Sequence, residues 1–218
     1  ESTGVATAQP VDDVRLGTVG VAVSGVEVTL GEHNEIIMRG GSMFKGYYKN
    51  DEATASTLKD GWLHTGDVGE WRDGQLKIVD RLKDIMITAG GKNLSPTEIE
   101  NTIKASPYIK ECIVIGEARK YVSALIQIDF DTVAKWAEQE RIAYTTFRSL
   151  TEQPQVNELI QAEVNKGNEQ LPQVAQIKRF HLLTKELDHD DDEVTATMKV
   201  RRSNIYEKYT EVIESLYA

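Results

Sequence analysis

The pattern of residues changes across positions 80–93, and this change constrains the fold more than any other feature of the chain. The charged segment 80–84 leads into the apolar or β-branched segment 85–88, and a glycine pair follows at Gly90 and Gly91. This order predicts the exit from one structural unit, then a short buried strand, then a loop whose backbone can closely approach a ligand.

The segment before this change is predicted to be rich in β-strands. Short apolar stretches at 19–23, 26–30 and 35–39 are separated by glycine. Asp73 and Gly74 lie between two strand-like arms, which is typical of a two-residue hairpin turn.

The segment after the change alternates between strands and helices. Ser95, Pro96 and Glu98 form the pattern of a helix start, with a capping serine, a proline at the first helical position and an acid three residues after the cap. The strands expected in this part are 111–115, 122–128 and 177–183. The helices expected are 96–105, 130–141, 156–167 and 203–217, and one further helix is expected in the first part at 51–58. These patterns predict an α+β chain with a boundary near residues 80–83.

Composition and charge limit the classes of function. The 218 residues are enough for one large or two small domains, and 40% hydrophobic with 28% charged residues is typical of a soluble globular protein. A net charge of -10 argues against nucleic acid or an anionic membrane as the main partner. The single cysteine, Cys112, excludes an internal disulfide and suits a reducing compartment, so we expect a cytoplasmic protein. No apolar run reaches the roughly 18 residues of a membrane span, which leaves only peripheral membrane contact open.

Two segments outside the helices hold candidates for binding. Asp67 ends the segment 62–67 just before a predicted strand, where its carboxylate can accept hydrogen bonds from the two vicinal hydroxyls of a ribose. From spacing alone, an aspartate that caps a local turn is the simpler interpretation. The pair Gly90 and Gly91 either forms a tight turn or lets a thin ligand chain pass along the backbone. Lys92 either meets a phosphate or only adds a solubilising charge.

A third candidate is Lys199, which follows the acidic segment 188–193. A lysine on a mobile loop can move against an oxyanion and stabilise it without transferring a proton. The alternative is a basic segment at the start of the last helix. The acidic segment itself is expected to be a solvated, mobile loop. The four histidines and one cysteine show no zinc-site spacing.

Five segments, taken in order, resemble the adenylate-forming acyl-CoA synthetase superfamily, and among its members the long-chain fatty acid–CoA ligases. The segments are GGSMFKGYYKN at 40–50, GWLHTGD at 61–67, DRLKD at 80–84, GGKNLSP at 90–96 and TATMK at 195–199. They are spread across nearly the whole chain. The resemblance implies the β-rich tail of a large adenylation domain at 1–80, a hinge at 81–83 and a small α/β lid domain at 84–218.

The resemblance also implies a reaction for the parent enzyme. A fatty acid carboxylate attacks ATP to give an acyl-adenylate and pyrophosphate, and the thiol of CoA then displaces AMP. Both steps develop negative charge on oxygen, which a cation and Mg²⁺ would stabilise. By position, Lys199 would be the adenylation lysine, Asp67 would bind the ribose hydroxyls, and Arg81 would assist at the ribose or phosphate.

Other positions carry over in the same way. Lys83 would be the residue about which the small domain rotates between the two steps. Gly90, Gly91 and Lys92 would line the path of CoA, and Glu1 would be a carboxylate associated with magnesium.

The chain departs from the family pattern at two places. It begins at Glu1, without the phosphate loop and acyl tunnel that the family carries upstream, and it has no signal-peptide features. We therefore expect a fragment that needs the missing N-terminal domain and does not complete adenylation alone. Ala196 stands where related sequences often have proline. The alternatives are another adenylate-forming ligase, for a medium-chain or aryl acid, and a binding module without chemistry.

Overall fold

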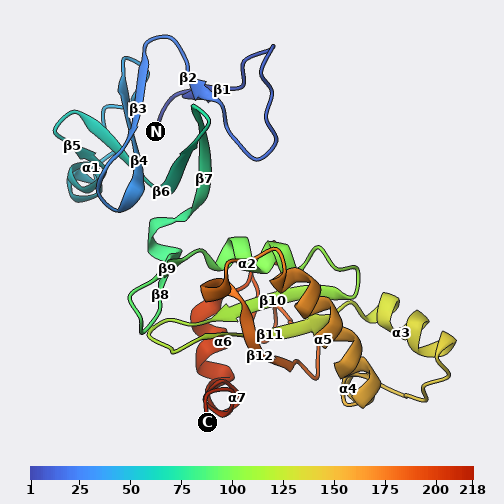
Figure 1. The fold of residues 1–218 in the computed structure, drawn as a ribbon. Helices are drawn as coiled ribbons and strands as arrows, with labels where there is room; N and C mark the ends of the chain where they lie inside the picture. Colours follow the sequence, from blue (N-terminus) through green and yellow to red (C-terminus); the bar gives the residue numbers. More distant parts are fainter. The chain divides into compact units, whose positions relative to one another are not determined.

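The structure, a computed structural model, describes residues 1–218. The chain divides into two compact units, Glu1–Ile85 and Met86–Ala218, and each is described by itself. Strands dominate the first unit, and strands and helices share the second (Figure 1), which confirms the predicted α+β class. None of the helices is both long enough and apolar enough to cross a lipid bilayer.

The N-terminal unit is built on an antiparallel sheet of five strands. Four of them follow the order β3–β4–β6–β5, and β7 also pairs with β6. Their bounds are Val26–Leu30 for β3, Glu35–Gly40 for β4, Leu58–Lys59 for β5, Trp62–Arg72 for β6 and Gln75–Arg81 for β7. A small sheet of β1 (Thr7–Ala8) and β2 (Val21–Ala22) and the helix α1 (Asp51–Thr57) complete the unit. The strand predicted at 19–23 is thus reduced to two residues, and the helix predicted at 51–58 is confirmed.

The predicted turn at Asp73 and Gly74 joins β6 to β7. Both residues have positive φ, 49° at Asp73 and 85° at Gly74, as a two-residue turn needs in order to match the twist of antiparallel strands. The register of the two strands then places Asp67 opposite Arg81. The hairpin therefore brings two residues that are 14 positions apart to the same point of the sheet.

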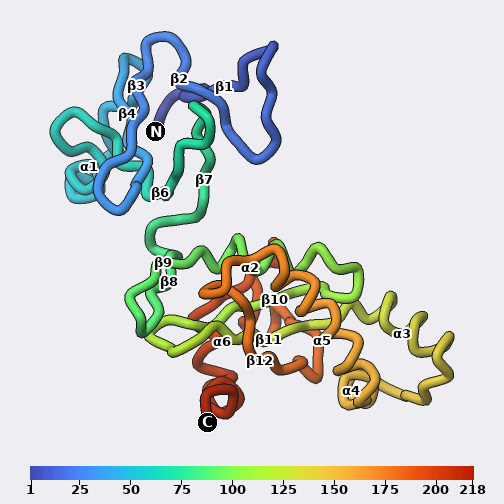
Figure 2. The backbone as a smooth tube through the Cα atoms, viewed as in Figure 1, coloured from blue at the N-terminus to red at the C-terminus, as the bar shows by residue number.

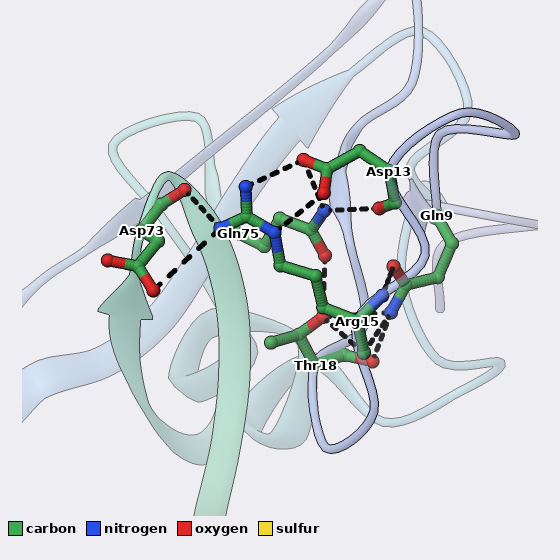
Figure 3. Close-up of polar contacts among 6 residues, drawn as sticks. All are labelled: Gln9, Asp13, Arg15, Thr18, Asp73 and Gln75. Atoms are coloured by element: carbon green, nitrogen blue, oxygen red, sulfur yellow. Dashed lines mark hydrogen bonds and ion pairs between the residues drawn. The ribbon is translucent and has the colours of Figure 1, made fainter.

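A polar network around Gln75, shown in Figure 3, ties the loop after β1 to this hairpin. Gln75 is buried, with 2% of its surface exposed. Its amide nitrogen donates to the backbone oxygen of Asp13 at 2.7 Å, and its amide oxygen accepts from Thr18 Oγ1 at 2.6 Å. A buried amide with these partners satisfies its hydrogen-bonding capacity inside the unit.

Arg15 and Gln9 extend the same network. Arg15 donates to both carboxylate oxygens of Asp13 at 2.7 and 2.8 Å, and to the backbone oxygen of Asp73 at 2.8 Å. Gln9 Oε1 accepts from the backbone nitrogen of Arg15 at 3.1 Å. The loop at 9–18 is therefore held by polar contacts rather than by an apolar core.

The C-terminal unit is built on a three-stranded sheet with β11 (Val122–Ile128) in the centre. β10 (Ile109–Ile115) lies antiparallel on one side, and β12 (Ile177–Leu182) lies parallel on the other. Figure 2 shows that β12 reaches the sheet from a distant part of the chain. The helices are α2 (Pro96–Ile103), α3 (Phe130–Gln139), α4 (Phe147–Thr151), α5 (Pro154–Asn168), α6 (Arg202–Lys208) and α7 (Thr210–Ser215). A hairpin of β8 (Met86–Ile87) and β9 (Asn93–Leu94) precedes α2.

Capping residues set the starts of α2 and α3, and the cap of α2 is the one that the sequence predicts. The Ser95 hydroxyl accepts from the backbone nitrogen of Glu98 at 3.0 Å, and Pro96 occupies the first helical position. The Asp129 carboxylate accepts from the backbone nitrogen of Thr132 at 3.1 Å. Each cap satisfies a donor that the first helical turn would otherwise leave without a partner.

Both faces of the C-terminal sheet are buried. Side chains of α2, α3, α4 and α5 pack with Val114 and Ile126 on one face, and side chains of α6 and α7 pack with Ile113 and Leu125 on the other. All seven residues of β11 are buried, although the sequence alternates in part. A central strand with helices on both faces needs no polar side, which explains the difference.

The single helix predicted at 203–217 is wrong, because α6 and α7 are separated at Tyr209. The Thr210 hydroxyl donates to the backbone oxygens of Tyr206 and Glu207, at 2.7 and 2.8 Å. Such local bonds compete with the backbone pattern of a continuous helix. The spacing of apolar residues in the sequence also does not predict α4, because five residues are too few to show helical periodicity.

The prediction of a solvated loop at 188–193 is wrong for Glu193, which is fully buried. Its carboxylate accepts from Lys185 at 2.8 Å, from Lys208 at 2.7 Å and from the Tyr209 hydroxyl at 3.0 Å. Lys208 and Tyr209 lie 15 and 16 positions further along the chain. A run of like charges does not reveal partners at that distance.

Candidate functional site

A groove of about 610 Å³ lies on the N-terminal unit, and three of the predicted site residues line it. These are Glu1, Asp67 and Arg81. The walls of the groove come from the start of the chain, from β4 and β6, from the end of α1 with β5, and from the end of β7. Glu35 and His64 line it as well. Residues from the two ends of this unit therefore meet at one place.

The pairing of β6 with β7 sets the geometry of Asp67 and Arg81. Arg81 Nε lies 3.1 Å from Asp67 Oδ1, and Arg81 Nη1 donates to the backbone oxygen of Thr65 at 3.3 Å. Burial raises the pKa of the Asp67 carboxyl, an effect that Arg81 opposes and Glu35 reinforces. A carboxylate has more acceptor positions than one ion pair uses, so Asp67 can also accept from the hydroxyls of a bound sugar.

Glu35 holds the backbone that leads into Asp67, a role the sequence analysis does not assign to it. One carboxylate oxygen of Glu35 lies 2.7 Å from His64 Nδ1, and the other accepts from the backbone nitrogen of Gly66 at 2.9 Å. The Thr65 hydroxyl accepts from the backbone nitrogen of Asp67 at 3.0 Å. Local patterns carry no signal for this clamp, because Glu35 and His64 are 29 positions apart.

Glu1, the predicted magnesium residue, contacts the same unit through Tyr47 and Phe44. The Tyr47 hydroxyl donates to Glu1 Oε1 at 2.5 Å, and this bond is the main reason that the pKa of Tyr47 is raised. The backbone nitrogen of Phe44 donates to the backbone oxygen of Glu1 at 2.8 Å. Nowhere in residues 1–218 do three or more His, Cys, Asp or Glu side chains gather as a metal site would need. Glu1 thus offers a single carboxylate.

The predicted CoA residues lie on the turn between β8 and β9 in the C-terminal unit. Gly91 N donates to Thr88 O at 2.8 Å, and Thr88 N donates to Lys92 O at 3.0 Å, which makes the turn tight. Gly91 has a φ of +72°, a conformation that favours glycine. At Gly90 no positive φ is required, and a Cβ there would meet only Thr88 Oγ1, at 3.9 Å. The backbone is therefore open at Gly90.

Lys199 lies on a second turn of the C-terminal unit, and we call residues 194–200 the Lys199 turn. Val194 and Val200 form an isolated antiparallel bridge at its base. Thr195 N donates to Lys199 O at 2.8 Å, and Lys199 N donates to Thr195 Oγ1 at 3.1 Å. The Lys199 side chain is exposed at the end of the turn.

Lys83, the predicted pivot, is exposed on the short 3₁₀ turn Leu82–Asp84. This turn precedes the division between the two units after Ile85. The predicted site residues thus fall into a groove, a connecting turn and two turns of the C-terminal unit.

The chain is of the α+β class, with a polar groove on its first unit and an α/β second unit. A model of a known family matches it directly. The family model described as AMP-binding enzyme C-terminal domain covers residues 83–218, which is more than half of the chain. The chain belongs to the AMP-binding enzyme C-terminal domain family. This confirms the resemblance to the adenylate-forming superfamily.

Relatives extend the likeness to the N-terminal unit. A putative fatty-acid–CoA ligase, fadD11, of Mycobacterium tuberculosis (strain ATCC 25618 / H37Rv) is 42% identical over 221 residues, covering 100% of this chain and 38% of that protein. The long-chain-fatty-acid–CoA ligase FadD15 of the same strain is 36% identical, covering 99% of this chain and 36% of that protein. The chain therefore spans well under half the length of these curated relatives.

Solved structures show the same fold. The crystal structure of the ATP-bound RpMatB–BxBclM chimera B1 matches with a TM-score of 0.63 and 27% identity. The match covers 97% of this chain and 40% of that one. The arrangement of strands and helices described above is thus shared with a larger protein that was crystallised with ATP.

Proposed function

We propose that this chain is the C-terminal portion of an AMP-forming long-chain fatty acid–CoA ligase. The full-length protein would convert a fatty acid, ATP and CoA into acyl-CoA, AMP and pyrophosphate. The observation that carries the proposal is the groove at which Asp67 and Arg81 form an ion pair beside Glu1. The names of the relatives, which cover the whole of this chain, support the choice of a fatty acid as substrate.

The residues of the groove have complementary tasks in this proposal. Asp67 accepts hydrogen bonds from the ribose hydroxyls of ATP, and its pairing with Arg81 keeps the carboxylate oriented. Arg81 has more than half of its side chain exposed, so its charge can reach toward a phosphate. The clamp from Glu35 to His64 and Gly66 keeps the strand that carries Asp67 in place.

Lys199 supplies the cation for the first half-reaction. Negative charge develops on oxygen as the fatty acid carboxylate attacks the α-phosphate, and an ammonium group placed there stabilises it without giving up a proton. An exposed lysine at the end of a short turn suits a group that approaches and then leaves. We propose residues 81–83, with Lys83, as the hinge for that movement.

The residues present fit magnesium as a partner of the substrate. Mg²⁺ keeps several waters and is usually bound by one or two carboxylates together with substrate phosphates. Glu1 would provide such a carboxylate at the groove. The bound ion would neutralise phosphate charge during the attack.

The full-length protein tests the proposal when it is given ATP, CoA and acids of increasing chain length. We expect release of pyrophosphate with long-chain fatty acids and much less with medium-chain or aryl acids. Turnover mainly with the shorter or aryl acids would identify another adenylate-forming ligase. No turnover with any acid would favour a binding module.

Gly90→Ala tests the proposed CoA path without disturbing the fold. Because Gly90 has no positive φ and open space around it, we expect the free energy of unfolding to change by less than about 0.5 kcal/mol. A methyl group on the path of pantetheine should nevertheless slow thioester formation from supplied acyl-adenylate. Thioester formation at the wild-type rate would remove this residue from the CoA path.

A further inference from the structure

We propose that Glu193 is a positioning residue for Lys199, because its buried carboxylate anchors the base of the Lys199 turn to the segment around the start of α7. The inference rests on the proposed function of Lys199 and deepens it. It also assigns a task to the acidic segment 188–193, which neither the resemblance nor the family match explains.

The backbone of Glu193 closes the base of the turn. Its carbonyl oxygen accepts from the backbone nitrogen of Arg201 at 2.9 Å, one position outside the bridge between Val194 and Val200. Residues 193 and 201 are therefore the outermost bonded pair of the turn, where its two arms join the rest of the unit. Any shift of Glu193 moves both arms.

The side chain of Glu193 is held by four donors. Lys208 Nζ lies 2.7 Å and Lys185 Nζ 2.8 Å from its carboxylate, and the Tyr209 hydroxyl and the backbone nitrogen of Asp188 each donate at 3.0 Å. The side chain has no exposed surface. Burial by itself would raise the pKa of the Glu193 carboxyl, but the bonds from Lys185 and Lys208 outweigh burial and lower it.

A second anchor lies beside the first. The Asp192 carboxylate pairs with Arg201 at 2.8 Å, and the Asp192 backbone oxygen accepts from Asn204 Nδ2 at 2.9 Å. Lys185 also pairs with Asp191. The acidic segment is thus tied to α6 at several points, and Glu193 is the only one of its acids that is fully buried.

The location of these contacts points to positioning rather than to stability alone. The hydrogen bonds of residues 195–199 join these residues only to one another, and the side chains from position 196 to position 199 are exposed. The orientation of the turn as a whole, and with it that of Lys199, is therefore set at the base. A buried charge is costly unless it is paired and hydrogen-bonded, and supporting hydrogen bonds hold a functional group in its productive geometry.

Glu193→Gln in the full-length protein tests the inference by hydrogen exchange and by half-reaction rates. The amide keeps the size of the side chain but removes the charge that holds Lys185 and Lys208. We expect the backbone amides of residues 195–201 to exchange at least about tenfold faster. Adenylation should fall about tenfold to a hundredfold, while thioester formation from supplied acyl-adenylate stays within about twofold.

The matched control is Glu186→Gln, a change of the same chemistry at an exposed acid on the same stretch of chain, which pairs only loosely with Lys110 at 3.9 Å. It should alter neither exchange nor either half-reaction. Tyr209→Phe removes one of the four donors and should give a smaller increase in exchange. This second variant decides the matter if Glu193→Gln fails to fold.

The outcomes separate this inference from the proposed function. Unchanged exchange in the Lys199 turn, or equal losses in both half-reactions, would overturn the positioning role of Glu193. If the wild-type protein adenylates no acid, the proposed function fails. Faster exchange in Glu193→Gln would then still support Glu193 as an anchor of the Lys199 turn, but not its role in positioning Lys199 for adenylation.

Discussion

The two units differ in what holds them together. In the C-terminal unit, thirty apolar side chains are buried in two clusters on opposite faces of one sheet. In the N-terminal unit only four are buried, namely Ile36, Leu63, Val68 and Leu76. That unit instead exposes large apolar side chains, with Val11 at 99% and Leu16 at 96%. The C-terminal unit therefore has a core of its own, whereas the N-terminal unit depends on strand pairing and on the network around Gln75.

This contrast suits the proposed function. In the proposed function, these exposed apolar side chains would be covered by the rest of a larger domain. The unit that would move carries a complete core, so it can change position without losing its structure.

The largest expected effect is on folding in isolation. Residues 86–218 alone should unfold cooperatively in urea and give a dispersed NMR spectrum, because their core is complete. Residues 1–85 alone should not, because four buried apolar side chains offset little of the conformational entropy of 85 residues. A dispersed spectrum from a monomeric 1–85 fragment would show that strand pairing and polar contacts are enough to fold this unit, which would contradict the contrast.

The same substitution in the two units should have unequal effects. Leu125→Ala removes a fully buried side chain from the central strand and should lower the free energy of unfolding by about 2–5 kcal/mol. Leu16→Ala should change it by less than about 0.5 kcal/mol, because that side chain is almost fully exposed. Urea unfolding of the 218-residue chain measures both, and similar losses would contradict the contrast.

Gln75→Leu tests whether the polar network stabilises the N-terminal unit. The change leaves the backbone oxygen of Asp13 and the hydroxyl of Thr18 without their buried partner, at a cost of about 1–3 kcal/mol. Gln161→Leu, at an exposed position of α5, is the control. If Gln75→Leu proved neutral, the polar network would not be what holds the loop at 9–18.

The smallest expected effect is a pH dependence in the C-terminal unit. Its cause is Glu193, whose pKa in the folded state lies below its ordinary value of 4.5. The unfolded chain then binds the proton more readily. The stability that ionised Glu193 contributes is therefore fully present above pH 4.5 and is lost as the pH falls through the folded-state pKa.

Urea unfolding of residues 86–218, wild type against Glu193→Gln, measures this effect. The difference between the two should be greatest near neutral pH and should shrink as the solution is acidified. A difference that stays constant from about pH 7 to about pH 3 would mean that the charge of Glu193 does not contribute.

The elements that the sequence predicted correctly depend on neighbouring residues. The cap at Ser95 and the turn at Asp73 and Gly74 each need partners within four positions. The same holds for the buried face of α2, since Ile99 and Ile103 follow helical spacing. Asp67 was a candidate from the residues alone, Arg81 was named only through the resemblance, and the hairpin register then placed them opposite each other.

What the sequence by itself determined is the α+β class, the strands and helices with strong periodic patterns, and the motifs that carry the family likeness. Only the tertiary structure decided that Glu35 clamps the backbone before Asp67, and that a run of acids contains a fully buried anchor at Glu193. The physical reason is the separation along the chain between the residues that interact. Caps and turns are completed by residues close along the chain, whereas burial and ion pairing depend on which distant segments fold against one another.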